Sequence, residues 1–113
     1  MNIHRVAELV EGRMVTGNDQ DRQVSFAFAS DLMSDVLTLM EDDVMLITGL
    51  ATVQAVRTAV MSDINTILLV RGKKATEEMM EIARTNEIAL IESAYSMFRS
   101  SGELYGDGLK AVF

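Results

Sequence analysis

Short apolar blocks alternate with polar turns along this chain, and the spacing within each block predicts an alternation of helices and strands. The first block has helical spacing, which predicts a short amphipathic helix over residues 2–11 that is stopped by Gly12. A brief strand over residues 13–16 and a turn follow. Residues 23–29 then alternate between large and small side chains, which predicts a second strand.

Three more strand–helix units complete the pattern. Continuous apolar runs predict buried strands at residues 44–48 and 66–70, and a short strand is expected at 89–91. Capping side chains predict helices that start near residues 31, 52, 76 and 96, the first of them carrying apolar residues as far as 40. Short connections of this kind require parallel strands with right-handed crossovers. We therefore expect the α/β class, as a three-layer α/β/α arrangement with a mostly parallel sheet of about five short strands.

The length of 113 residues fits one domain, with the short helix at 2–11 and a core at 12–109. The chain has no cysteine and one histidine, which excludes disulfides, thiolate nucleophiles and zinc ribbons. Its net charge of −7 opposes nucleic-acid binding. The apolar runs are far shorter than the roughly 20 residues of a membrane helix, and the first residues do not resemble a secretory signal. We expect a cytoplasmic protein with no membrane contact, no metal and no cofactor.

In an open parallel sheet, ligands bind outside the carboxyl ends of the strands. One loop at this edge runs from Thr48 to Thr52 and contains Gly49, whose backbone N–H can approach an anion. The helix after it has no acidic residue in its first turn, so its positive end is not neutralised. The simpler alternative is that Gly49 only makes the turn and Thr52 only caps the helix.

The basic cluster of the chain follows the next strand and consists of Arg71, Lys73 and Lys74 around Gly72. These cations suit a phosphate group, but two glutamates begin the following helix and oppose an anion there. A solvated loop or a partner-binding edge is the alternative interpretation. The spacing of a P-loop is absent.

Two further loops at the same edge complete the candidate site. One follows the second strand, and the other contains a tyrosine whose ring can stack on a base or whose hydroxyl can donate a hydrogen bond. The alternative for that tyrosine is packing in the core. The candidate ligand-binding residues are Ser30, Asp31, Thr48, Gly49, Thr52, Arg71, Gly72, Lys73 and Tyr95.

No set of side chains indicates catalysis. The acidic cluster at 41–43 precedes a strand and therefore lies at the opposite edge of the sheet. His4 lies on the opening helix without a nearby nucleophile. Because a nucleophile, a base and an orienting group cannot be assembled, we expect no catalytic residue and no enzyme activity.

Two segments of the chain resemble the DRTGG domain family. They are Asp63–Gly72 (DINTILLVRG) and Ile88–Phe98 (IALIESAYSMF), and the segments 30–37 and 44–49 agree with that family's serine–aspartate helix start and central strand. The resemblance spans residues 12–109. It implies a fold like the N-terminal domain of HPr kinase/phosphorylase.

The name-giving polar residues of that family are not intact here. Where many members have Gly-Asp-Arg, this chain has Gly49-Leu50-Ala51, and where they have Thr-Gly-Gly it has Arg71-Gly72. Any ligand that those polar groups hold in other members is therefore not carried over. The chain is more similar to small free-standing members, some of which are encoded near iron-hydrogenase subunits. The family implies a regulatory, self-associating module rather than a catalyst.

Two hypotheses remain from the sequence. The first is a non-catalytic regulatory module that forms a homodimer and senses a small anionic ligand such as a nucleotide. The alternative is an assembly factor that binds a protein partner without a small ligand, linked by the resemblance to iron-hydrogenase systems. The apolar end at 109–113 favours the alternative, since Phe113 is expected to pack against the domain or a partner.

Overall fold

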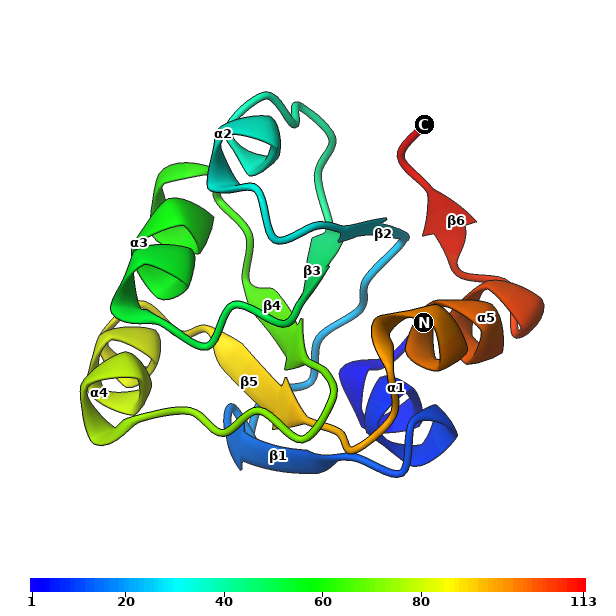
Figure 1. Cartoon of the computed structure of the whole chain (residues 1–113), viewed down its shortest axis with the longest axis horizontal. Coiled ribbons are helices and arrows are strands. Elements are labelled where there is room, and N and C mark those ends of the chain that lie inside the picture. Colours follow the sequence, from blue (N-terminus) through cyan, green and yellow to red (C-terminus); the bar gives the residue numbers. More distant parts are fainter.

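A single twisted sheet of six strands, in the order β1-β5-β4-β3-β2-β6, forms the middle of the molecule (Figure 1). The computed structural model describes all residues, Met1–Phe113. The strands are β1 (Arg13–Thr16), β2 (Phe26–Ala29), β3 (Val44–Thr48), β4 (Thr66–Leu69), β5 (Ala89–Glu92) and β6 (Lys110–Ala111). The helices are α1 (Ile3–Leu9), α2 (Met33–Val36), α3 (Val53–Met61), α4 (Glu77–Thr85) and α5 (Met97–Gly106).

The sheet is parallel except at one edge, where β1 pairs antiparallel with β5. The prediction of a mostly parallel α/β sheet is confirmed. The number of strands is six rather than about five, because β6 adds two residues beside β2. Both residues of β6 are exposed, so the sequence has no alternation of apolar and polar residues that predicts this strand.

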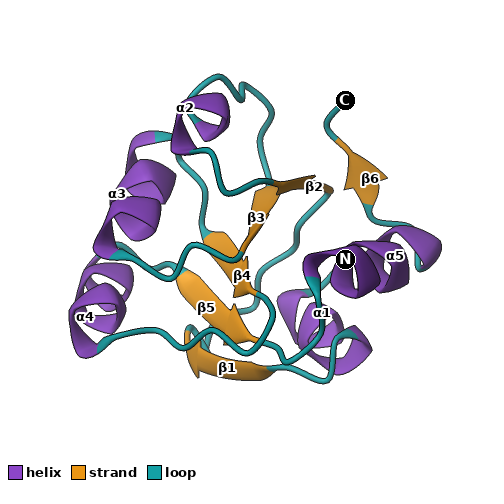
Figure 2. Cartoon of the chain, viewed as in Figure 1, coloured by secondary structure: helices purple, strands orange, loops and turns teal.

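Helices cover both faces of the sheet, as the three-layer prediction requires (Figure 2). Alternate residues of each central strand point to opposite faces. Leu46 of β3 packs with α2, α3 and α4, whereas its neighbours Met45 and Ile47 pack with α1 and α5. The continuous apolar runs of β3 and β4 therefore supply two separate cores.

The helix predicted to start near residue 31 is much shorter than the run as far as 40 suggested. Only α2, four residues long, is helical. The hydroxyl of Thr38 donates to the carbonyl oxygen of Asp35 at 2.7 Å, a local bond that competes with continuation of the helix. Met40 is 91% exposed, so no packing on the sheet offsets that loss.

Gly12 does not stop the opening helix in the predicted way. The residue in the left-handed region is Glu11 (φ 47°), and the N–H of Gly12 donates to the carbonyl of Ala7 at 2.7 Å. Glycine is needed at position 12 because the chain touches β5 there. A Cβ atom would lie 2.9 Å from Cγ2 of Ile91.

Gly17, after β1, combines a positive φ of 80° with close packing on β5. A Cβ atom would lie 2.8 Å from the backbone Cα of Ala89. We predict that Gly17→Ala lowers the free energy of unfolding by about 2–4 kcal/mol, since overpacking and left-handed strain add. Urea unfolding measures the change. Gly102→Ala is the matched control, because this α5 glycine has open space around it and the change should stabilise by about 0.5–1 kcal/mol. Equal effects at both positions would contradict the packing argument.

Candidate functional site

A pocket of about 330 Å³ lies at the carboxyl ends of β3 and β4. Loops after β2, β3 and β4 and the first residue of α5 meet there, as expected at this edge of a parallel sheet. The residues around it are Asp31, Gly49, Val70, Arg71, Lys73 and Met97. Four of the nine predicted site residues are therefore brought together.

Asp31 organises the side of the pocket that follows β3. Its Oδ1 accepts hydrogen bonds from the hydroxyl of Thr48 at 2.8 Å and from the N–H of Gly49 at 2.7 Å. The Thr48 hydroxyl in turn accepts from the N–H of Leu50 at 3.1 Å. The N–H of Gly49 is thus already satisfied by a carboxylate of the chain itself. The other carboxylate oxygen of Asp31, Oδ2, has no hydrogen-bond partner.

Three of the predicted residues have local structural roles outside the pocket lining. The hydroxyl of Thr52 accepts from the N–H of Ala55 and caps α3. The hydroxyl of Ser30 accepts from the N–H of Leu32 at 3.0 Å. The N–H of Gly72 donates to the carbonyl of Ser93 at 2.9 Å. Capping by Thr52 agrees with the simpler interpretation of that residue.

The opposite side of the pocket is basic. Arg71 and Lys73 are exposed and form no ion pair, since the ion pairs of the structure are Arg5–Glu8, Arg5–Asp107 and Lys74–Glu92. The backbone of Arg71 is left-handed, with φ 60°, and its N–H donates to the carbonyl of Tyr95 at 2.7 Å. Two cations without an ion-pair partner and the carboxylate of Asp31 therefore line the same small pocket.

Glu92, which was not predicted, fixes the loop between β4 and α4. Its side chain is 7% exposed, Oε2 accepts from the N–H of Ala75 at 2.7 Å, and Oε1 lies 3.6 Å from Nζ of Lys74. A buried carboxylate needs such partners. Its signal in the sequence was a glutamate at the end of an otherwise apolar run.

Tyr95 does not line the pocket. Its hydroxyl donates to the carboxylate of Glu11, and the guanidinium of Arg99 lies over its ring, 3.7 Å from the ring centre. The hydrogen bond to Glu11 is the main cause that raises the pKa of Tyr95, with burial second, and the positive charge of Arg99 acts in the opposite direction. The residue joins the segment before α5 to the segment after α1.

No group of three or more His, Cys, Asp or Glu side chains is arranged to hold a metal ion. The ring Nε2 of His4 lies 3.2 Å from the carbonyl oxygen of Gln20. No helix is both long and apolar enough to cross a membrane.

These features define a three-layer α/β domain with a small charged pocket at the carboxyl edge of its sheet. The family model of the DRTGG domain matches residues 5–105, which is most of the chain. The chain belongs to the DRTGG domain family.

One similar solved structure is the regulatory region of a Clostridium perfringens pyrophosphatase, with its CBS and DRTGG domains, complexed with the activator diadenosine tetraphosphate. The TM-score is 0.73 and the sequence identity is 10%, so the likeness concerns the fold. The match covers 90% of this chain and 45% of that one, so this chain spans less than half of that regulatory region. The comparison with curated proteins finds no match.

The contacts of Tyr95 predict two opposite effects on its pKa. Glu11→Gln should lower the pKa of Tyr95 toward its ordinary value, because a neutral amide accepts the hydroxyl proton less strongly. Arg99→Gln should raise that pKa further, because the positive charge is removed. Absorbance titration at alkaline pH measures both in a Tyr105→Phe background, where Tyr95 is the remaining tyrosine of two. Shifts of the same sign in both variants would contradict the geometry.

Proposed function

We propose that this chain is a non-catalytic, self-associating regulatory module that binds a small anionic ligand, of the nucleotide kind, in the pocket between Asp31 and Arg71. The observation that carries the proposal is the pair of unpaired cations, Arg71 and Lys73, held at the rim of this pocket in a protein of net charge −7. An exposed cation that has no internal partner is free to bind a phosphate.

The free oxygen of Asp31 adds a second requirement to the ligand. A carboxylate accepts hydrogen bonds and repels anions, so the ligand must present a hydrogen-bond donor on this side of the pocket. A sugar hydroxyl next to a phosphate meets both requirements, whereas inorganic phosphate meets only one. Val70 and Met97 supply apolar surface between the two charged sides. This chemistry favours a nucleotide or another sugar phosphate.

The regulatory part of the proposal is supported by the family. The regulatory region of the pyrophosphatase of similar fold was solved with a nucleotide activator. We propose the same class of role here, in the cytoplasm, with self-association of the domain and without catalysis. Ligand binding then alters what the domain contacts, rather than any reaction within it.

Ligand binding predicts a thermal shift that depends on the rim cations. A nucleoside monophosphate at 100 times its dissociation constant should add about 2.7 kcal/mol to the free energy of unfolding. Arg71→Glu and Gly49→Asp should abolish this shift, since each places a negative charge in the pocket. Arg57→Glu is the matched control, because it makes the same charge change on the exposed side of α3. An equal loss in the control would mean that only net charge matters.

The proposed role of Asp31 predicts that its substitution changes the preference for a nucleotide over inorganic phosphate. Asp31→Asn keeps an oxygen for Thr48 and Gly49 but replaces the free oxygen by an amide donor. The affinity for a nucleoside monophosphate, relative to inorganic phosphate, should fall roughly 10-fold or more. Isothermal titration with both ligands measures the ratio. A ratio equal to that of the unchanged protein would contradict the role of Asp31.

The assembly-factor hypothesis has one specific observation in its favour. Large apolar side chains are exposed around α2 and at the end of α3, namely Leu32, Leu37, Met40, Val60 and Met61. Such a surface suits a protein partner, for which the family resemblance suggests a component of iron-hydrogenase systems. A chain that binds no nucleotide or sugar phosphate in the titrations above would favour this alternative.

A further inference from the structure

One exposed side of α5 is apolar or small along its whole length. Phe98 and Tyr105 are 91% and 70% exposed, and Ser101 and Gly102 lie between them on the same side. These four residues follow the i, i+3, i+4, i+7 spacing of a helix stripe. They carry no charge. We call them the α5 stripe.

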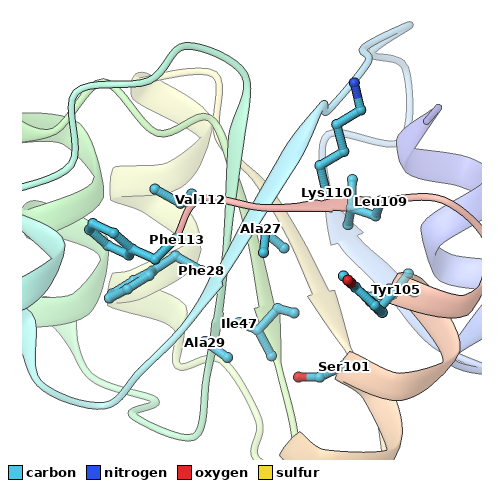
Figure 3. Close-up of a pocket in the computed structure, with 12 residues that line it drawn as sticks. Ala27, Phe28, Ala29, Ile47, Ser101, Tyr105, Leu109, Lys110, Val112 and Phe113 are labelled. Atoms are coloured by element: carbon cyan, nitrogen blue, oxygen red, sulfur yellow. The ribbon is translucent and has the colours of Figure 1, made fainter.

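The α5 stripe continues into an apolar groove of about 320 Å³ (Figure 3). Ser101 and Tyr105 belong to both, and Figure 3 shows them on the α5 side of the groove. Ala27 and Ala29 line its β2 side with small side chains. On the far side, Phe113 packs edge to face on Phe28 but stays 89% exposed.

We propose that the α5 stripe and this groove form the surface through which two copies of the chain associate. This proposal rests on the self-association in the proposed function. Antiparallel packing of α5 on its copy, about a two-fold axis between Ser101 and Gly102, places the small residues opposite each other. The same operation places Phe98 of each copy opposite Tyr105 of the other. Such self-complementarity is what a two-fold interface requires.

The small residues at the axis allow the two helices to approach closely. No atom lies within 4 Å of a Cβ position at Gly102, so this part of the helix is open to a neighbour. Each Phe98 then lies at the mouth of the other copy's groove, beside Tyr105. A large aromatic side chain that enters an apolar pocket is the typical anchor of a stable interface.

The exposed area is sufficient for a dimer. Phe98, Tyr105 and Phe113 together expose on the order of 500 Å² per copy, hence about 1,000 Å² in two copies. Specific interfaces begin near 1,200 Å² in total, and the small residues of the stripe and the groove walls supply the remainder. Because the stripe is uncharged, two copies that each carry a charge of −7 can meet there without juxtaposed carboxylates.

Sedimentation equilibrium of the whole chain tests the surface. Phe98→Asp should raise the dimer dissociation constant roughly 30-fold or more, as loss of an anchor does. The variant should fold, because the side chain is exposed and an aspartate in the first turn of α5 stabilises the helix. Met61→Asp is the matched control, since it also places a carboxylate on an exposed apolar helical position. Its dimer should be unchanged.

Disulfide crosslinking tests how the two α5 helices are aligned in the proposed dimer, since the chain has no cysteine of its own. Gly102→Cys should form a disulfide-linked dimer under mild oxidation, because the axis brings the two positions together. Ser34→Cys, exposed on α2, should not.

The outcomes of these experiments distinguish failure of the proposed surface from failure of self-association itself. A dimer that Phe98→Asp leaves intact, or that Gly102→Cys does not crosslink, overturns the surface while self-association stands. A monomer at all concentrations overturns both, whereas the titrations with nucleotides test the anionic ligand independently.

Discussion

Burial of β3, β4 and β5 on both faces is the constraint on which the rest of the structure depends. Every residue of these strands is buried and most of the apolar ones belong to one of two cores, so polar groups are tolerated only at strand ends. Thr48 and Glu92, at the carboxyl ends of β3 and β5, both bond to neighbouring loops. The polar side chains of these strands that bond to loops therefore lie at one edge of the sheet.

Hydrogen bonds between different loops help to shape the pocket at that edge. Asp31, after β2, holds the turn after β3. Glu92 holds the segment before α4, and the backbone of Tyr95 holds that of Arg71. Each loop is thus held by a residue that is distant in sequence. This arrangement fixes the backbone of Arg71 and leaves its guanidinium without an ion-pair partner, which would lower the entropy lost on binding of the proposed ligand.

The sequence was most informative where packing alone decides the structure. The apolar run of 44–48 became β3 with the predicted bounds, because a strand buried on both faces has an unmistakable composition. It was least informative where a single distant contact decides. The two residues of β6 and the bond between Tyr95 and Glu11 depend on partners that no local period reveals. For the candidate site, the edge of the sheet and four residues of the pocket were predictable, but the engagement of Gly49 by Asp31 was not.

Ser93 ties three parts of the chain together. Its hydroxyl donates to the carbonyl of Val10 and accepts from the N–H of Tyr95, while its carbonyl accepts from Gly72. The end of α1 and the loop of Arg71 are therefore held by the same buried residue. Thermodynamic linkage is reciprocal, so any free energy by which the position of α1 affects a ligand in the pocket is the free energy by which that ligand affects α1.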